Sequence, residues 1–231
     1  MSEGGILLAG GSGTRMQGLT DDKILYVVNR KPVFLYSIET FVASGLFAEI
    51  VIVYRDKSQR RTLESIVQTL DYKTLPAISW TMGGAERMHS VMKGLRAFQN
   101  EPEQVFIHDC ARPAIGTGLV LALAKAALEH GAACAAQRIT DTIKRTDGNN
   151  PAILENLPRK CLWGMETPQV FRHKEICEGY EMAETQGIHV TDDTTALALT
   201  GRRVCLVENP RPNPKLTTPT DLAWLEFLLK Q

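Results

Sequence analysis

The sequence lacks a net charge, a long apolar run and a recognisable leader. Its 231 residues contain 26 Lys and Arg residues against 26 Asp and Glu residues. This balance removes the electrostatic case for generic binding to DNA, RNA or anionic membranes. No stretch reaches the roughly 18 apolar residues that a membrane helix requires, and the first residues show no basic segment before an apolar one. We therefore expect a cytoplasmic protein that binds neither nucleic acid nor membrane.

The cysteines also lack a pattern. There are five, an odd number, and they are widely spread at positions 110, 134, 161, 177 and 205 without a Cys-x-x-Cys pair. This spacing argues against a zinc site and against a disulfide framework. Reduced thiols in the cytoplasm are the simplest interpretation.

What the sequence does contain is an alternation of short apolar runs and amphipathic stretches. The runs predict strands near residues 6–9, 50–53, 78–82, 105–107, 132–137 and 204–207. Helical spacing predicts helices over 33–44 (ended by Gly45), 58–70, 86–98 and 119–130, one from His173, a short one after Thr191 and one from Pro219. Strands alternating with helices of this length predict an α/β fold with a mostly parallel sheet covered by helices on both faces. The length suits a single domain over residues 1–231.

The alternation breaks between residues 138 and 171. Polar segments containing Gly and Pro, such as residues 146–151, separate short β-like pieces there. We interpret residues 138–171 as an inserted β-arm that protrudes from the domain rather than as a second domain.

Ligands in open α/β sheets bind at the carboxyl ends of the strands, so functional residues are expected in the loops that follow the predicted strands. The first loop reads Gly10-Gly11-Ser12-Gly13-Thr14-Arg15-Met16, and Lys23 follows shortly after. Glycines let backbone N–H groups approach a phosphate as an anion-binding nest, and two cations beside it suit a triphosphate. A tight strand–helix turn with solvated charges would give the same sequence.

Two further loops carry polar residues. In one, Gly83-Gly84-Ala85 precedes a helix that contains Ser90, which suits a base lying against the backbone but equally an ordinary turn and helix cap. In the other, Asp109 directly follows a buried strand and Arg112 comes three residues later. A carboxylate there suits Mg²⁺ that bridges phosphates, although a simple Asp109–Arg112 ion pair is an alternative. His108 is expected to be a core histidine.

The remaining polar segments are weak signals when taken singly. They are Asp141-Thr142-Ile143-Lys144, Arg159, Thr167-Pro168-Gln169, Thr191-Asp192-Asp193 and Asn213-Pro214-Lys215. Thr191-Asp192-Asp193 is also a typical helix N-cap, and Lys215 alone would be a solvated lysine.

Taken in order along the chain, however, these motifs resemble the 2-C-methyl-D-erythritol 4-phosphate cytidylyltransferase family. The likeness extends from Ile6 to Phe227 and includes Trp163 and the Pro-Lys-Leu-Thr-Thr-Pro segment around Lys215. It implies a Rossmann-like core of the nucleotidyltransferase type and a β-arm through which two subunits form a homodimer. It also implies transfer of CMP from CTP to 2-C-methyl-D-erythritol 4-phosphate, with release of pyrophosphate and with Mg²⁺ or a similar divalent cation, as a step in isoprenoid precursor biosynthesis by the non-mevalonate pathway.

The resemblance also assigns roles to individual residues. Arg15, Lys23 and Lys215 would be catalytic, acting on the triphosphate. The cytidine nucleotide would be held by Ala9, Gly10, Gly11, Gly13, Gly84, Ala85 and Ser90. The acceptor would be bound by Asp109, Arg112, Thr142, Arg159 and Thr191, with Arg159 reaching it across the dimer. Asp109 would also hold the metal ion.

The sequence departs from the family pattern at Asp22-Lys23-Ile24-Leu25-Tyr26, at Met88 and Lys93, and at Thr194-Thr195. Two other functions stay open at this point. One is ribitol 5-phosphate cytidylyltransferase activity, against which Ala111 and Trp163 weigh. The other is a non-catalytic nucleotide-binding protein, suggested by the changes around Lys23 and Met88.

Overall fold

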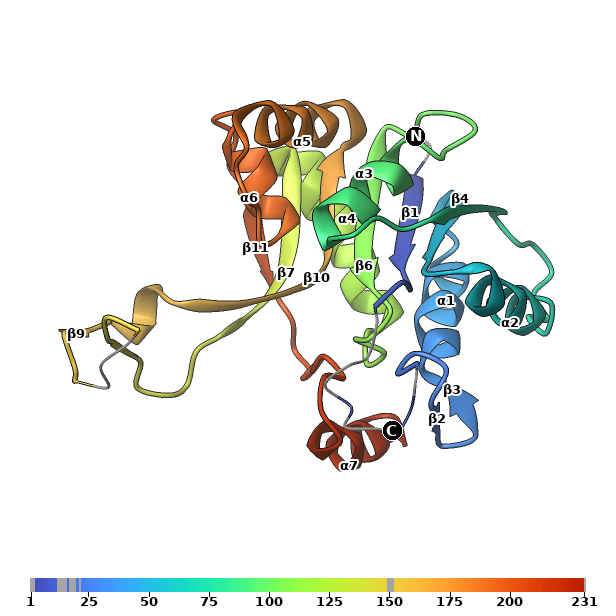
Figure 1. Cartoon of the computed structure of the whole chain (residues 1–231), viewed down its shortest axis with the longest axis horizontal. Coiled ribbons are helices and arrows are strands. Elements are labelled where there is room, and N and C mark those ends of the chain that lie inside the picture. The colour runs from blue at the N-terminus through green and yellow to red at the C-terminus, as the bar shows by residue number, and fades with distance from the viewer. Residues whose placement is uncertain (1–2, 12–15, 17–19, 21, 149–151, 231) are drawn as a thin grey trace.

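The core of the protein is a seven-stranded sheet. The computed structural model describes residues 3–11, 16, 20, 22–148 and 152–230. The sheet has the order β11-β7-β10-β6-β1-β4-β5 (Figure 1). Its strands are β1 (Glu3–Leu8), β4 (Phe47–Tyr54), β5 (Ala77–Met82), β6 (Gln104–Asp109), β7 (Ala132–Arg138), β10 (Trp163–Arg172) and β11 (Cys205–Glu208). All neighbouring pairs are parallel except those of β10 with β6 and β7, which confirms the predicted mostly parallel α/β sheet.

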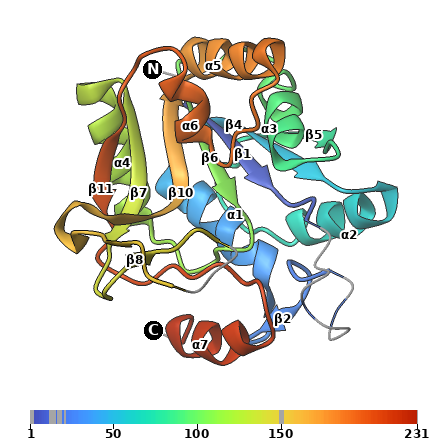
Figure 2. The same cartoon turned by 60° about the vertical axis from the view of Figure 1, so that its left-hand side comes forward.

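Helices cover both faces of this sheet (Figure 2). One face is covered by α1 (Val33–Ser44), α2 (Lys57–Val67) and α4 (Thr117–His130), and the other by α3 (Arg87–Leu95), α5 (His173–Gln186) and α6 (Asp193–Ala198). Along β4, Ile50 and Ile52 pack into one core cluster while Val51 and Val53 pack into the other. Burial on both faces explains why this strand reads as an unbroken apolar run. In the described part of the chain, no helix has the length and apolar character needed to span a membrane.

Local sequence signals set most helix ends. Gly45 ends α1 in the left-handed conformation, with φ of 67°, as predicted. Asp56 caps α2 by accepting hydrogen bonds from the backbone N–H groups of Ser58 and Gln59, so α2 begins one residue before the predicted start. It ends at Val67 rather than at residue 70, and α3 ends at Leu95 rather than at residue 98.

The sequence prediction was wrong about residues 163–171. They belong to β10, an antiparallel strand inserted between β6 and β7, and not to the arm. Two features hid this strand. Its interior contains Pro168, and its pairing with β7 is interrupted between Met165 and Gln169. Prolines and buried polar residues in a run argue against a central strand when only the sequence is read.

The arm itself spans residues 139–162 and projects away from the sheet (Figure 1). It contains a short antiparallel pair, β8 (Lys144–Arg145) with β9 (Glu155–Asn156), and the 3₁₀ helix η2 (Arg159–Cys161). The predicted protruding β-arm is therefore confirmed, with a shorter extent than residues 138–171.

The last elements lie at the carboxyl end of the sheet. A small hairpin, β2 (Val27–Val28) with β3 (Lys31–Pro32), was not predicted, and α7 (Thr220–Leu228) packs against it. The hairpin turns at Asn29 and Arg30, which both have positive φ. Glycine is the usual signal for this conformation, and its absence at the turn explains why the hairpin was not predicted.

Candidate functional site

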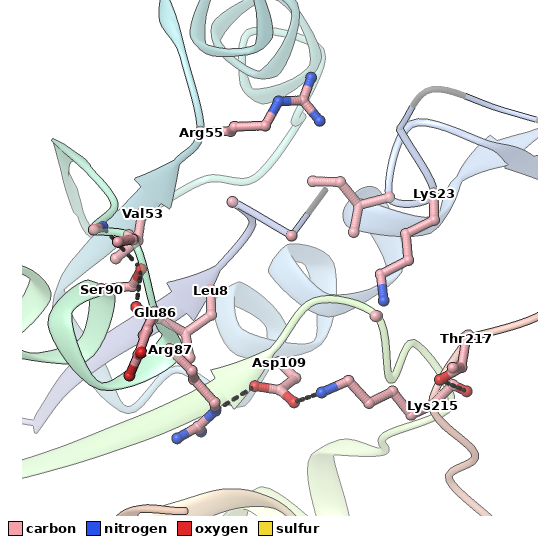
Figure 3. A pocket seen from close by; sticks show the side chains of 16 residues that line it. Leu8, Lys23, Val53, Arg55, Glu86, Arg87, Ser90, Asp109, Lys215 and Thr217 are labelled. Atoms are coloured by element: carbon pink, nitrogen blue, oxygen red, sulfur yellow. Dashed lines mark hydrogen bonds and ion pairs between the residues drawn. The ribbon is translucent and has the colours of Figure 1, made fainter. Parts of the chain in front are cut away.

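The site is built on one row of the sheet. The strand registers place Leu8 beside Val53 on one side and beside Asp109 on the other. These residues stand at the carboxyl ends of β1, β4 and β6, where ligands bind in open α/β sheets. A cavity of about 590 Å³ opens above them (Figure 3).

The cavity is lined by residues from the loops that follow the strands and from the segment before α7. The lining residues are Leu8, Gly10, Gly11, Lys23, Ile24, Val53, Arg55, Gly84, Ala85, Glu86, Arg87, Ser90, Asp109, Ala111, Lys215 and Thr217. Eight residues assigned from the sequence are thus brought together: Gly10, Gly11, Lys23, Gly84, Ala85, Ser90, Asp109 and Lys215.

Asp109 lies between two cations. The Lys215 ammonium donates a hydrogen bond of 2.6 Å to Asp109 Oδ2, and Arg87 Nε donates one of 3.3 Å to Oδ1. Burial by itself raises the pKa of the Asp109 carboxyl, but Arg87 and Lys215 outweigh it and hold that pKa well below the usual range. Asp109 is therefore a carboxylate at neutral pH.

Arg87 is in turn held by a second carboxylate. Its two terminal nitrogens each donate a 2.8 Å hydrogen bond to Asp193, which is fully buried. Tyr180 Oη donates a 2.5 Å hydrogen bond to the same carboxylate. Burial opposes the charged form of Arg87, but Asp193 and Asp109 raise the pKa of the guanidinium well above its ordinary value. The result is a continuous chain of charges from the core between α5 and α6 to the cavity.

The segment that carries Lys215 is fixed to the loop after β6. The Leu216 N–H donates a 2.7 Å hydrogen bond to the carbonyl of Ala111, and Arg112 Nη1 donates one of 2.8 Å to the carbonyl of Asn213. These contacts hold Lys215 beside Asp109 although 106 residues separate the two in sequence.

Lys23 approaches the same place from the first loop. Only 8% of its surface is exposed, and its side chain extends toward Asp109 and Lys215 (Figure 3). A Cβ placed on Gly11 would lie 3.6 Å from Lys23 Cε, so the glycine loop runs alongside the lysine stem. The cavity therefore collects positive charge from two distant segments beside one carboxylate.

The loop over Gly83 and Gly84 is closely packed. Ser90 Oγ accepts a 3.0 Å hydrogen bond from the Gly84 N–H and donates one of 3.1 Å to the Glu86 carbonyl. A Cβ on Gly84 would collide with the Cβ of His89. Glycine is therefore required at position 84 for the loop to lie against α3, and the Ser90 hydroxyl fixes the shape of the loop.

Two assigned residues, Ala9 and Arg112, are not among the residues that line the cavity, and their contact with a ligand stays a prediction. Ala9 is fully buried, and its N–H and carbonyl bond to Val53 and Gln59. Arg112 bonds to backbone carbonyls and makes no ion pair with Asp109 among the described residues. Their positions follow from the chain path, which turns inward at Ala9 and away from the cavity after Ala111.

Three more assigned residues lie away from the cavity of this chain. Thr142 and Arg159 are on the arm and exposed, and Arg159 donates a 2.8 Å hydrogen bond to the Thr140 carbonyl. Thr191 is exposed directly before Asp192, which caps α6 through the Thr195 N–H. Gly13 and Arg15 lie outside the described residues.

The donor set of the cavity fits a cation that is held mainly by substrate. Among the described residues no group of three or more His, Cys, Asp or Glu side chains could enclose a metal ion. Asp109 is an ionised carboxylate at neutral pH and faces the cavity, and Mg²⁺ in phosphate-transfer sites needs only one or two carboxylates beside substrate phosphates. His108 is no candidate ligand, because it is fully buried and its two ring nitrogens are hydrogen-bonded to the hydroxyls of Ser37 and Thr167.

The sequence reading missed Arg87, Asp193 and Arg55. Arg87 was visible in the Gly-Gly-Ala-Glu-Arg motif, but its partner Asp193 lies 106 residues further along. Arg55 follows β4, a strand whose end carries no glycine or other motif. Only the sheet order reveals that this end borders the cavity.

An open α/β sheet with a glycine loop, converging lysines and a buried carboxylate at its carboxyl edge defines an enzyme of the nucleotidyltransferase type. The sequence model of the family described as "IspD: 2-C-methyl-D-erythritol 4-phosphate cytidylyltransferase" matches residues 5–231. The chain belongs to this family.

Individual relatives agree with the family match. The 2-C-methyl-D-erythritol 4-phosphate cytidylyltransferase of Shouchella clausii is 35% identical over 231 residues, covering 100% of this chain and 98% of the relative. The chloroplastic enzyme of the same name from Oryza sativa is 33% identical, covering 98% of this chain and 74% of the relative. The crystal structure of 4-diphosphocytidyl-2C-methyl-D-erythritol synthase from Anaerococcus prevotii superposes with a TM-score of 0.85 at 26% identity, covering 100% of this chain and 99% of that one.

Proposed function

We propose that this protein transfers CMP from CTP to 2-C-methyl-D-erythritol 4-phosphate, giving 4-diphosphocytidyl-2-C-methyl-D-erythritol and pyrophosphate, in isoprenoid precursor biosynthesis. The observation that carries the proposal is the convergence of Lys23, Lys215 and Asp109 on one cavity, in a chain of this family. No observation favours ribitol 5-phosphate as acceptor or a purely nucleotide-binding role.

The reaction needs charge neutralisation more than proton transfer. The acceptor phosphate is already a nucleophile, and one of its oxygens attacks the α-phosphorus of CTP while the bond to the pyrophosphate oxygen breaks. The obstacles are repulsion between two anions and the charge that accumulates on the α-phosphoryl oxygens. Fixed cations in a partly buried cavity lower both barriers without reorganising during the reaction.

Lys23 and Lys215 are placed to do this. Both ammonium groups lie at the side of the cavity where Asp109 stands, opposite Arg55 (Figure 3). We assign Lys23 to the triphosphate and to the charge that develops at the α-phosphate, and Lys215 to the same phosphate. Arg15, outside the described residues, would add a third cation to the triphosphate.

The glycine loops would hold the nucleotide. Gly10 and Gly11 leave the backbone open to phosphate or ribose, and Gly84 and Ala85 offer backbone groups to the cytosine base. Ser90 acts on this subsite by bonding to the Gly84 N–H. Asp109 would hold Mg²⁺ together with phosphate oxygens, and the ion would supply further neutralisation of the triphosphate charge.

The arm is proposed to complete the site in a homodimer. Its tip exposes Ile153 and Leu154, which are 64% and 58% accessible. Apolar side chains at the end of a projecting arm favour burial against a second copy. Thr142 and Arg159, which lie on the arm of this chain, would then bind the acceptor of the neighbouring subunit, with Thr191 and Arg112 near its own acceptor subsite.

A pyrophosphate-release assay tests the function. The protein is incubated with CTP, Mg²⁺ and either 2-C-methyl-D-erythritol 4-phosphate or ribitol 5-phosphate, and the nucleotide product is identified by mass spectrometry. We expect stoichiometric pyrophosphate and 4-diphosphocytidyl-2-C-methyl-D-erythritol with the first acceptor only. CTP binding without pyrophosphate release from either acceptor would instead support the nucleotide-binding alternative. Faster release with ribitol 5-phosphate would replace the proposed acceptor.

A further inference from the structure

The segment around Lys23 belongs to no helix or strand, so something other than a ladder of backbone bonds must fix this lysine. On its carboxyl side, the Ile24 carbonyl accepts a 2.8 Å hydrogen bond from the Phe34 N–H at the start of α1. Ile24 is also almost fully buried. On this side, the position of Lys23 is therefore fixed by ordinary packing against α1.

On the amino side, the position of Lys23 is fixed by Asp22, whose side chain is only 7% exposed. Its Oδ1 accepts a 3.2 Å hydrogen bond from the Ile24 N–H, which spans Lys23 and tightens the turn. Its Oδ2 accepts a 2.6 Å hydrogen bond from Gln59 Nε2 and lies 3.4 Å from Arg55 Nη1. A buried carboxylate is costly unless such partners satisfy it, so its position is tightly determined.

Gln59 connects this carboxylate to the sheet. The residue is 2% exposed, and its Nε2 also donates a 3.0 Å hydrogen bond to the Ala9 carbonyl at the end of β1. Its Oε1 accepts a 2.6 Å hydrogen bond from the Arg55 N–H directly after β4. One amide thus joins the ends of two central strands to the residue before Lys23.

Arg55 closes the arrangement. It lines the cavity, and Asp56 Oδ2 accepts a 2.8 Å hydrogen bond from its Nε while Asp22 holds its Nη1. The Asp22 carboxylate therefore orients two cations of the cavity. It acts on Lys23 through the backbone and on Arg55 through an ion pair.

We propose that Asp22 is a positioning residue: its carboxylate, anchored to the sheet by Gln59, sets where the Lys23 ammonium stands in the cavity. The inference rests on the proposed function, since it assumes that Lys23 stabilises the α-phosphate. It differs from a general contribution to folding because its effect should pass through Lys23 and appear in turnover.

The experiment compares Asp22→Asn and Gln59→Met with the parent protein in the pyrophosphate-release assay. Asp22→Asn keeps the side-chain volume but sets an amide donor against Gln59 and removes the charge opposite Arg55. Gln59→Met keeps the length and removes the bond to the sheet. Misplacing a catalytic group by about 1 Å can cost up to 10²-fold in rate. We expect kcat to fall by roughly tenfold or more in each variant, with KM for CTP changed much less.

Glu49→Gln is the matched control. Glu49 is a comparably buried carboxylate at the other end of β4, where it bonds to Ser79 and to the Gln99 N–H away from the cavity. Its removal should lower thermal stability while leaving kcat at the parent value. Thermal unfolding of all variants separates loss of fold from loss of positioning.

A double-mutant cycle with Lys23→Ala decides whether Asp22 acts through Lys23. Residues that act as one unit are non-additive, so Asp22→Asn should have little further effect on kcat once Lys23 is removed. A folded Asp22→Asn variant with the parent kcat, or full additivity in the cycle, overturns the inference. Turnover of Lys23→Ala at the parent rate would instead refute the role given to Lys23 in the proposed function.

Discussion

The Lys215 ammonium and the Asp109 carboxylate form an ion pair of 2.6 Å at the edge of the cavity, although they belong to segments 106 residues apart. On the other side of the same carboxylate stands Arg87, itself bound to buried Asp193. Opposite charges therefore alternate along Asp193, Arg87, Asp109 and Lys215. This alternation lets cations be concentrated at the cavity without repelling one another when phosphate is absent.

Replacing the lysines tests the charge-neutralisation mechanism. Lys23→Ala or Lys215→Ala should lower kcat by about 10²–10³-fold, the typical cost of removing one preorganised group that stabilises transition-state charge. CTP binding, measured by titration calorimetry, should weaken far less. Lys125→Ala, on the exposed face of α4, is the control and should match the parent in both measurements. Parent-like turnover in both active-site variants would contradict the assignment.

Asp193→Asn tests the buried partner of Arg87. Asp193→Asn removes the closer partner of Arg87 and leaves the guanidinium with only the 3.3 Å contact to Asp109, so the free energy of unfolding should fall by up to about 3–5 kcal/mol. Tyr180→Phe removes only a hydrogen bond to the same carboxylate and should cost about 1 kcal/mol. Urea denaturation monitored by circular dichroism measures both. Equal losses in the two variants would show that Asp193 does not act chiefly through Arg87.

Gly84→Ala tests the packing of the nucleotide loop. The added Cβ collides with His89, so the loop must move away from α3 and carry its backbone groups with it. We expect KM for CTP to rise about tenfold, which corresponds to ~1.4 kcal/mol. Gly116→Ala, where a Cβ meets nothing within 4 Å, should leave KM unchanged. An unchanged KM in Gly84→Ala would place the base elsewhere.

The double variant Ile153→Asp/Leu154→Asp tests the arm as a dimer contact. Each buried side chain of this size contributes about 1.5–3 kcal/mol, so their replacement by carboxylates should shift the protein to monomer at micromolar concentration. Size-exclusion chromatography with light scattering measures the mass. Leu121→Asp, at a comparably exposed leucine on α4, should not change it. A parent protein that is already monomeric would refute the proposed homodimer.

The cysteines offer a pH-dependent prediction. Burial, assisted by Glu181 and Glu101, raises the pKa of the Cys177 thiol to about 11. Only the thiolate reacts with iodoacetamide, so at pH 8 roughly one Cys177 side chain in 10³ is reactive, and the rate should rise about tenfold per pH unit up to pH 11. Peptide mass spectrometry should find exposed Cys161 alkylated long before Cys177. Equal rates at pH 8 would show that Cys177 is not shielded.

Local sequence was sufficient to predict the helices and strands whose apolar residues follow a single helical or strand pattern. The helical spacing of α1 with its terminal Gly45 predicted that helix to the residue, and the apolar run at residues 50–53 predicted the middle of β4, which extends over Phe47–Tyr54. The glycine loops could also be placed at the candidate site, because parallel strands bring their carboxyl ends to one edge of the sheet.

Other features depend on contacts between distant segments and could not be predicted locally. β10 carries buried Glu166 and Gln169, which are tolerated because Asn209 and Thr194 supply their hydrogen bonds. Ala9 stands in the sequence where a ligand contact is expected, directly after β1. Its carbonyl instead accepts a hydrogen bond from Gln59, fifty residues away. Hydrogen bonds between such distant residues depend on the order of the strands in the sheet, which the periodicity of the sequence does not indicate.

The two legs of the arm continue β7 and β10, strands that pair with each other within the sheet. Everything between them can therefore be lengthened, shortened or exchanged while the ladder of the core stays intact. In the proposed homodimer, the acceptor preference of a subunit would then be free to diverge through changes in the arm of its neighbour, independently of the residues that bind the nucleotide.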